Sequence, residues 1–301
     1  MRRITLLTNP DVCNLRCPLC FLNQRALHNC DVANCNKERR AFGMGEMSFE
    51  VARAAIEKYA AERDTSGKRL LREVIPSTMG EPLLYSHFDE LLELCRALGI
   101  PLNLTTNGTF PGKWGSDAAM ELLLRSCSDI KVSYLASEQF DGWKANVEKL
   151  VRVRDRLREN AESAGDAGVK CAGIAKSRVT TVSLQVTLHK KNLQEVPEIV
   201  LWASAIGIDR IKWNKVVLLK SVPSEFQKEY ELTEDDVALL RSRLKSTKVR
   251  CEGSLFFTDS HNGDCAMGGV CGVSCPFKDE IWILPDGSEN HCPDPERRFG
   301  M

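Results

Sequence analysis

The stretch DVCNLRCPLCF, residues 11–21, comes directly after the first apolar run of the chain, RITLLTN at residues 3–9. It places Cys13, Cys17 and Cys20 at the spacing Cys-x3-Cys-x2-Cys. The 301-residue chain holds 13 cysteines, and most of them gather near its two ends. In a reducing compartment, clustered cysteines more often bind metal or carry out redox chemistry than form disulfides. The question is therefore which metal this loop would hold.

The charge and hydropathy of the chain indicate a soluble protein. Lys plus Arg and Asp plus Glu number 41 each, so no net charge attracts nucleic acid or an anionic membrane. The sequence contains no run of about 18 apolar residues, and its start lacks the features of a signal peptide. We therefore expect a cytoplasmic protein that has no membrane span and does not take nucleic acid as a partner.

Strand-like and helix-like segments alternate through most of the chain. The strand candidates are residues 3–9, 72–82, 101–108, 129–135, 179–189 and 209–219. The helix candidates are residues 48–62, 87–99, 117–126, 140–163, 193–207 and 231–246. This alternation predicts a parallel α/β sheet with crossover helices, either a barrel or an open doubly wound sheet. Helical periodicity fades near residue 247, and we predict two domains, 1–247 and a Cys-rich 248–301.

Residue periodicity supports these assignments. In the fifth strand candidate, apolar residues alternate with polar ones, as in a strand with one buried face: Val182, Leu184, Val186 and Leu188. In the second helix candidate, an apolar stripe includes Cys95, which we expect to act as a small buried hydrophobe. Thr233 is expected to cap the helix near residue 234.

The number of cysteines in the loop limits what it can hold. A structural zinc site or an ordinary ferredoxin cluster uses four protein ligands. Three thiolates with no fourth nearby can bind three irons of a cubane and leave the fourth iron open to a small molecule. The loop also follows the first strand, at the end where α/β barrels place their chemistry.

This loop resembles the signature of the radical S-adenosylmethionine superfamily, which has Cys-x3-Cys-x2-Cys after the first strand. Members commonly carry an aromatic residue before the last cysteine, whereas this chain has Leu19 there and Phe21 after Cys20. Taken alone, the spacing also suits a zinc site or a chance cluster.

A second match lies at the end of the second strand candidate. Family members usually carry a glycine-glycine-glutamate stretch there that contacts the methionine amino group of the cofactor. This chain has Met79 in place of the first glycine, followed by Gly80, Glu81 and Pro82. Alone, these residues would read as an ordinary strand-end turn.

Two more matches follow at later strand ends. The sequence TTNG, which contains Thr106 and Asn107, is common in the family and helps to shape the cofactor pocket. Asn107 and the glycine after it would by themselves indicate only a turn. Ser133 stands where many relatives place a polar residue on the ribose or carboxylate of the cofactor.

The resemblance covers residues 4–215 and implies a partial TIM-like barrel of six β/α units. It implies a 4Fe–4S cluster on Cys13, Cys17 and Cys20, whose open iron chelates S-adenosylmethionine. One electron, from a donor such as flavodoxin or ferredoxin, then yields methionine and a 5′-deoxyadenosyl radical that abstracts hydrogen from the substrate. The side chains expected to face into the barrel, near cofactor or substrate, are Gln185, Lys212 and Asn214.

The tail resembles the SPASM and Twitch extensions of such enzymes, and more closely the shorter Twitch form. Residues 280–292 predict a hairpin with its turn at Asp286-Gly287. The resemblance implies an auxiliary 4Fe–4S cluster, with Cys251 as a substitute ligand and a leading set of Cys265, Cys271, Cys275 and Cys292. A zinc ribbon on the same cysteines is the alternative.

Cys30 and Cys35 lie in the long loop before the first helix candidate. The sequence leaves three roles open for these two cysteines: a second metal-binding pair, a place in a loop that covers the substrate, or a plain structural role.

The leading hypothesis is an oxidoreductase-type enzyme that oxidises, dehydrogenates or couples a small molecule through hydrogen abstraction. A maturase that crosslinks or epimerises ribosomal peptides is the alternative, weakened because the cluster loop begins at residue 13 and no peptide-recognition domain is expected before it. RNA modification and a non-enzymatic iron–sulfur or zinc module rank lower. Such a module would not need a cofactor pocket, whereas this chain carries the motifs expected to form one.

Overall fold

The computed structural model describes residues 2–21, 23–24, 45–76, 79–134, 142–163, 180–256 and 279–292. The strands are β1 Arg2–Leu6, β2 Leu71–Pro76, β3 Leu102–Thr106, β4 Cys127–Tyr134, β5 Thr181–Leu188, β6 Arg210–Lys215, β7 Arg250–Glu252, β8 Glu280–Ile283 and β9 Glu289–Asn290. The α-helices are α2 Phe49–Ala61, α3 Phe88–Ala97, α4 Asp117–Ser126, α5 Trp143–Ser163, α6 Val196–Ile206, α7 Ser224–Tyr230 and α8 Glu234–Leu244. Short 3-10 turns are η2 Pro82–Leu84, η3 Gly112–Gly115, η4 Lys190–Glu195 and η5 Ser254–Phe256.

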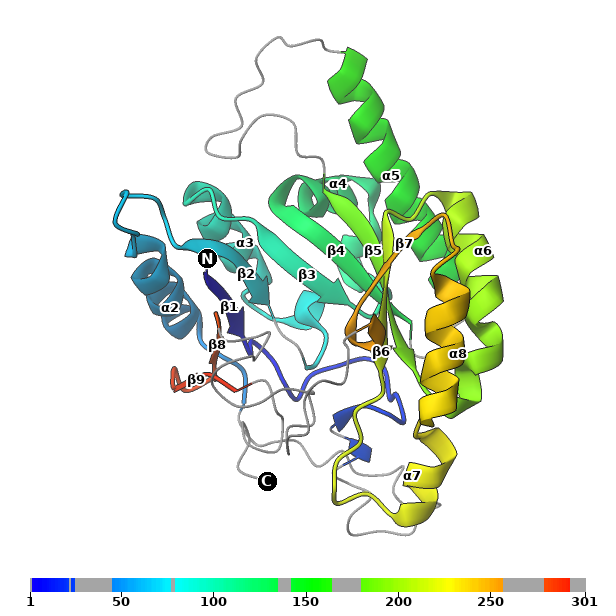
Figure 1. The fold of residues 1–301 in the computed structure, drawn as a ribbon. Coiled ribbons are helices and arrows are strands. Elements are labelled where there is room, and N and C mark those ends of the chain that lie inside the picture. Colours follow the sequence, from blue (N-terminus) through cyan, green and yellow to red (C-terminus); the bar gives the residue numbers. More distant parts are fainter. Residues whose placement is uncertain are drawn as a thin grey trace.

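The strands form one curved sheet in the order β7-β6-β5-β4-β3-β2-β1-β8-β9 (Figure 1). Strands β1 to β6 are parallel and neighbour one another in sequence order, with connecting helices along the outer side of the sheet (Figure 1). This arrangement confirms the predicted α/β class and is that of an open, partial TIM barrel.

The described parts of residues 248–301 join both edges of this sheet. β7 pairs in parallel with β6 at one edge, and β8 pairs in parallel with β1 at the other. β9 returns antiparallel to β8, around the turn predicted at Asp286-Gly287. Gly287 has φ +86°, a left-handed conformation that suits glycine. The domain boundary near 247 stays a prediction.

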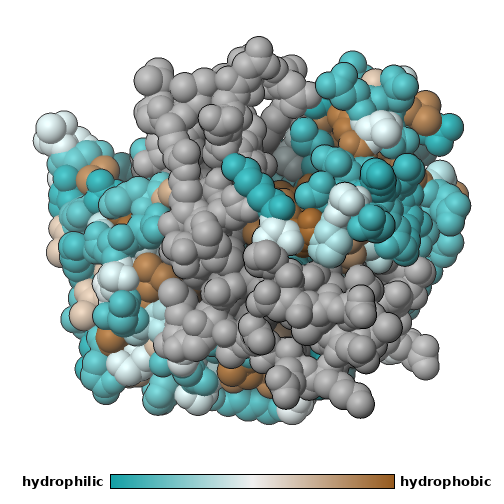
Figure 2. All heavy atoms as spheres, turned by 90° about the horizontal axis from the view of Figure 1, so that it is seen from below, coloured by the Kyte–Doolittle hydropathy of each residue, from teal (hydrophilic) through white to brown (hydrophobic). Residues whose placement is uncertain are grey.

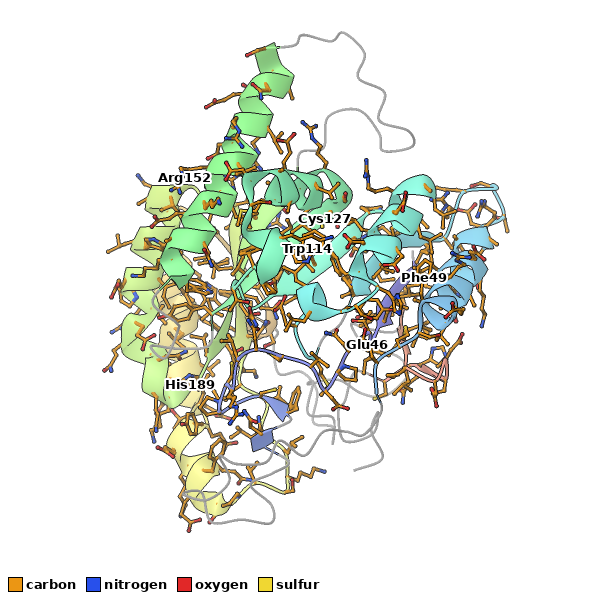
Figure 3. The ribbon with its side chains drawn as sticks, turned by 180° about the vertical axis from the view of Figure 1, so that it is seen from behind. Glu46, Phe49, Trp114, Cys127, Arg152 and His189 are labelled. Carbon is orange, nitrogen blue, oxygen red and sulfur yellow. The ribbon has the colours of Figure 1, made fainter. Side chains whose placement is uncertain are left out.

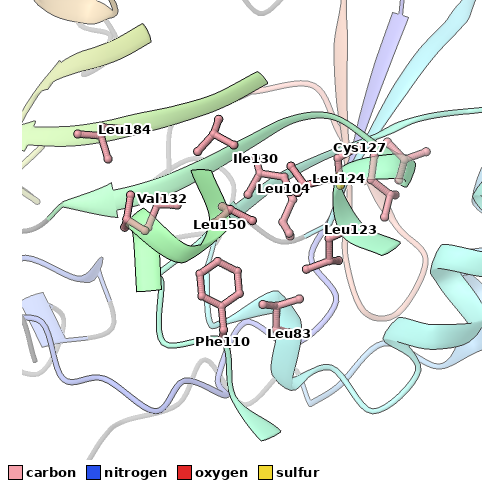
Figure 4. Close-up of a cluster of buried hydrophobic side chains, with 14 of the residues drawn as sticks. Leu83, Leu104, Phe110, Leu123, Leu124, Cys127, Ile130, Val132, Leu150 and Leu184 are labelled. Atoms are coloured by element: carbon pink, nitrogen blue, oxygen red, sulfur yellow. The ribbon is translucent and has the colours of Figure 1, made fainter. Parts of the chain in front are cut away.

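The outer face of the sheet is apolar. Val182, Leu184, Val186 and Leu188 of β5 are fully buried, as their alternation predicted. Figure 4 shows Leu104, Ile130, Val132 and Leu184 of three strands beside the apolar side chains of α4 and α5. This layer, together with Cys95 on α3, holds the helices against the sheet and supplies most of the burial that stabilises the fold.

The inner face of the same strands is polar. Arg3 of β1 pairs with Glu280 of β8 at 2.8 Å, and Arg210 of β6 pairs with Asp129 of β4 at 2.6 Å. TIM barrels usually fill this interior with bulky branched residues. The described interior of this sheet is instead lined partly by charged residues.

The cap predicted for the helix near residue 234 is present in the structure. Thr233 caps α8 and forms a capping box with Asp236, as expected of a Thr followed three residues later by an acidic residue.

Helix α7 and strand β7 were not predicted, because each is too short to show periodicity. Figure 3 shows Glu46 and Phe49 at the start of α2, where Glu46 accepts a 2.8 Å bond from the backbone of Ser86.

Candidate active site

The first half of the cysteine loop rests on the end of β2. Asn9 donates through Nδ2 to the carbonyl of Glu81 at 2.8 Å, and the Glu81 N–H donates to the carbonyl of Val12 at 2.8 Å. Gly80 has φ +74°, and a Cβ there would lie 2.1 Å from the carbonyl oxygen of Asn9. Only glycine fits this position, because both the backbone angle and the close approach exclude a side chain.

The Glu81 carboxylate joins the end of β2 to the end of β3. It accepts bonds from Thr106 Oγ1 at 2.8 Å, from the Asn107 N–H at 2.7 Å and from the Leu83 N–H at 3.3 Å. The carboxyl group is buried, which raises its pKa to about 7 although these donors favour the charged form. Thr106 is likewise buried, and Pro82 begins η2. The side chains of Glu81 and Thr106 are thus engaged within the protein.

Asn107 connects the end of β3 to the cysteine loop. Its Nδ2 donates to Asn14 Oδ1 at 2.8 Å and lies 3.7 Å from the Sγ of Cys13. Its Oδ1 accepts bonds from the N–H and Oγ1 of Thr109, and Asn14 in turn donates to Thr109 Oγ1 at 2.9 Å. The TTNG segment is therefore a turn, and it also touches the first cysteine. The Leu15 N–H, 3.4 Å away, is a second donor to the same sulfur.

The second half of the cysteine loop is held from the other side of the barrel. Gln24 is fully buried, and its Nε2 donates to the carbonyls of Leu19 at 2.8 Å and Val217 at 3.1 Å. Its Oε1 accepts from the Leu219 N–H at 2.9 Å. One side chain thus ties the loop around Cys20 to the segment that follows β6.

Ser133, Gln185 and Lys212 lie in one register row across β4, β5 and β6. They alternate with the outward apolar residues, so they occupy the inner face, as predicted for Gln185 and Lys212. Asn214, two residues farther along β6, accepts a 3.3 Å bond from the Ser254 N–H and holds η5 in place. The strands run downward in Figure 1, and in the view from below the described atoms that are visible are mostly hydrophilic, with smaller hydrophobic patches between them (Figure 2).

The tail is described only in part. Cys265, Cys271, Cys275, Cys30 and Cys35 lie outside the described residues. Cys292 follows β9, and its N–H donates to Asn290 Oδ1 at 2.8 Å. The Sγ of Cys251 lies 3.2 Å from both Trp213 Nε1 and Thr247 Oγ1, on the outer face of β7.

The described cysteines of the site form no disulfide. Within the described ranges, no group of three metal-binding side chains converges on a single ion. In a cubane cluster each thiolate binds its own iron, so its ligands do not converge on one point.

A sequence model of the radical SAM superfamily matches residues 10–203, more than half of the chain. The chain belongs to the radical SAM superfamily. Members of this superfamily are enzymes expected to use S-adenosylmethionine and a 4Fe–4S cluster. In sequence, 114 residues of this radical SAM protein are 34% identical to 7,8-dihydro-6-hydroxymethylpterin dimethyltransferase of Methanocaldococcus jannaschii. That match covers 35% of this chain and only 17% of the other protein.

Solved structures share the fold at low sequence identity. Streptococcus suis SuiB bound to S-adenosylmethionine superimposes with a TM-score of 0.53 and 15% identity, covering 97% of this chain and 60% of SuiB. The anSMEcpe structure with bound AdoMet and Cp18Cys peptide gives a TM-score of 0.58 and 15% identity, covering 97% of this chain and 74% of that one. This radical SAM chain thus spans less than two thirds of SuiB. Within the described ranges, it contains no helix with the length and apolar character needed to cross a membrane.

Sequence reasoning missed four residues that build the site: Asn9, Asn14, Gln24 and Thr109. Each acts through hydrogen bonds to residues distant in sequence, so no spacing pattern marks them. Asn9 and Asn14 flank the first cysteine, and their position is the sole clue that the sequence offers.

Proposed function

We propose that this chain is a radical SAM enzyme that binds a 4Fe–4S cluster through Cys13, Cys17 and Cys20. The observation that carries the proposal is the contact between three separate motifs. Gly80-Glu81 and Asn107 both hold the cysteine loop, so the motifs matched one by one in the sequence form one structure.

The chemistry of this donor set fits such a cluster. Three cysteines lie on one loop, and N–H donors from Leu15 and Asn107 lie near the sulfur of Cys13. Hydrogen bonds to cluster sulfurs tune reduction potential. When bound, the cluster and S-adenosylmethionine supply the one-electron cleavage that gives methionine and a 5′-deoxyadenosyl radical.

The chain's own residues would position the substrate and exclude water. Ser133 and Gln185 line the inner face in the same register row as Lys212. They suit a polar substrate held within reach of the cofactor. We propose hydrogen abstraction leading to oxidation or bond formation on a small molecule, with a flavodoxin- or ferredoxin-type electron donor.

A second candidate is peptide modification. Structures of the same fold include SuiB with the precursor peptide SuiA and anSMEcpe with peptides. These likenesses concern the fold alone, so the peptide substrate ranks second. Methyl transfer, named for the Methanocaldococcus jannaschii relative, ranks below both because the match covers so little of that protein.

An auxiliary 4Fe–4S cluster on Cys265, Cys271, Cys275 and Cys292 is part of the proposal. It would accept the electron left on a substrate radical. The described part of the tail supports only the position of Cys292, at the end of a hairpin docked on β1.

Anaerobic reconstitution tests the proposal directly. Iron, sulfide and 5′-deoxyadenosine, formed with dithionite and S-adenosylmethionine, would be measured for the wild type and for a Cys13/Cys17/Cys20→Ala variant. We expect the variant to lose about four irons and all 5′-deoxyadenosine formation. Cys95→Ala is the matched control, because this buried cysteine lies on α3, away from the loop. A fully loaded wild type that forms no 5′-deoxyadenosine would contradict the proposal.

A further inference from the structure

A buried lysine stands on the inner face of the barrel. Lys131 of β4 alternates with the outward residues Ile130 and Val132, and its side chain is only 6% exposed. Its Nζ donates to Asn103 Oδ1 of β3. Among the described residues, no carboxylate oxygen lies within 4.0 Å of this ammonium group.

The carboxylates nearest to Lys131 are already paired with other groups. Asp129 forms an ion pair with Arg210 at 2.6 Å and accepts hydrogen bonds from Ser183 at 2.7 Å and Thr181 at 2.8 Å. Glu73 of β2 accepts from Ser128 at 2.8 Å and pairs with Arg72 at 3.0 Å, and Arg3 lies 3.7 Å away. Neither carboxylate neutralises the buried ammonium group directly.

Among the described residues, one carboxylate on this part of the inner face serves three cations. Glu252 of β7 is shared by Arg210 at 3.5 Å, Lys212 at 3.4 Å and Arg250 at 3.3 Å. Burial and, next, the Lys212 ammonium lower the pKa of Lys131 to about 8, against the opposing effect of Asp129 and Glu73. A charge that is buried without an oppositely charged partner is costly, and a bound anion would offset that cost.

We propose that Lys131 and Lys212 form an anion site for a carboxylate or phosphate group of the substrate. The inference rests on the proposed radical SAM function and deepens it, because it assigns the enzyme an acidic substrate. Lys212 lies in the same row as Ser133 and Gln185, and Lys131 lies two residues before Ser133, about 6.6 Å deeper along β4. An anionic group held there would place the rest of the substrate toward the cysteine loop.

The carboxylate of S-adenosylmethionine could occupy the same anion site. The affinity of each variant for S-adenosylmethionine distinguishes this case from a site for the substrate. Succinate and inorganic phosphate serve as probes, titrated calorimetrically into the full-length reconstituted protein at constant ionic strength. We expect Lys131→Met to weaken probe binding at least tenfold and Lys212→Gln to weaken it severalfold. Lys144→Gln, which removes an exposed lysine paired with Glu198 on the outer side, should leave it unchanged.

S-adenosylmethionine affinity should stay within twofold of the wild type in Lys131→Met. A loss of cofactor affinity equal to the loss of probe affinity would overturn the substrate assignment and give the site to the cofactor. Equal probe binding by wild type and Lys131→Met, or no probe binding by wild type, would overturn the proposal altogether.

Thermal unfolding provides a readout independent of catalysis. Without probe, Lys131→Met should melt close to the wild-type temperature, because the removal of a buried charge that has no carboxylate partner relieves a desolvation cost while the buried Asn103 Oδ1 loses its donor. Succinate should raise the melting temperature of the wild type and not that of the variant. The same rise in both proteins would contradict the anion site. If 5′-deoxyadenosine forms while no anion binds, this inference alone fails; if anions bind but no 5′-deoxyadenosine forms, the proposed function fails.

Discussion

The backbone N–H of Asn107 donates to the Oε2 of Glu81 at 2.7 Å, so the turn after β3 is fixed by the carboxylate that follows β2. Through its main chain, the same glutamate holds Asn9 and Val12 at the start of the cysteine loop. One buried residue thus connects two strand ends and the loop, and a change to it should affect all three.

Replacement of Glu81 by Gln should change how stability depends on pH. The pKa of this carboxyl is raised from 4.5 to about 7, chiefly by burial. Between these pH values the folded state binds more protons than the unfolded state. The contribution of this carboxyl group to the stability of the fold is therefore fully present below about pH 4.5 and is lost as pH rises through 7. The loss amounts to about 3 kcal/mol in the free energy of unfolding.

Urea unfolding of wild type and Glu81→Gln at pH 5 and pH 7.5 measures this difference. The variant should show a smaller decrease between the two pH values. It should also lose about 1–3 kcal/mol at pH 5, because an amide NH2 would face the Asn107 N–H or the Thr106 hydroxyl. If stability changed with pH in the same way in both proteins, the raised pKa of Glu81 would be refuted.

Gly80→Ala should disrupt the cysteine loop. Its Cβ would lie 2.1 Å from the Asn9 carbonyl oxygen and 2.7 Å from that of Val12, and both are backbone atoms that cannot move aside cheaply. Gly67→Ala is a matched control, because Gly67 has φ +78° and nothing within 4 Å of the added Cβ. The control should lose about 1–2 kcal/mol from backbone strain and keep its iron.

Iron per chain after reconstitution, measured beside the free energy of unfolding, separates the two glycine variants. Gly80→Ala should lose more stability than the control and bind substantially less iron. Full iron loading of Gly80→Ala would show that the contact with Asn9 does not shape the loop.

Gln24→Leu should release the cysteine loop from the segment after β6. The change leaves the Val217 carbonyl and the Leu219 N–H without their side-chain partner, at a cost of about 1–3 kcal/mol for each buried group left unsatisfied. All three cysteines remain, so the cluster should assemble but lose iron to a chelator several times faster than in the wild type.

Asn192→Leu supplies the control for Gln24. Asn192 is as buried as Gln24 and lies after the end of β5. Its Oδ1 accepts a hydrogen bond from the His189 N–H, and its Nδ2 donates to the Thr187 carbonyl. It should cost similar stability without changing the rate of iron loss. If both variants lose iron equally fast, general destabilisation explains the effect of Gln24.

Cys251→Ala should leave the iron content unchanged. The Cys251 sulfur accepts a 3.2 Å bond from the Trp213 indole and lies in the outer layer, so we predict a structural role for it. Its removal should cost about 1–2 kcal/mol, whereas Cys292→Ala should lower iron from about eight to about four per chain. Loss of iron from Cys251→Ala would favour Cys251 as a cluster ligand, and zinc in place of iron in the tail would contradict the auxiliary cluster.

Much of the fold could be predicted from the sequence because periodicity is a local property. The alternation in β5 and the apolar stripe around Cys95 each follow from burying one face of a strand or helix. Short elements such as α7 and β7 could not be found in this way. The parallel pairing of β8 with β1 was also beyond prediction, because it joins opposite ends of the chain.

The sequence by itself determined the three-cysteine loop, the α/β order and the motifs at each strand end, since each is carried by neighbouring residues. Only the tertiary structure decided that Glu81 turns its carboxylate toward β3, that Gln24 reaches Val217, and that Lys131 is buried without a carboxylate partner within 4.0 Å among the described residues. Those facts depend on how the sheet curves. Curvature brings side chains from distant strands together, and no local pattern encodes which of them meet.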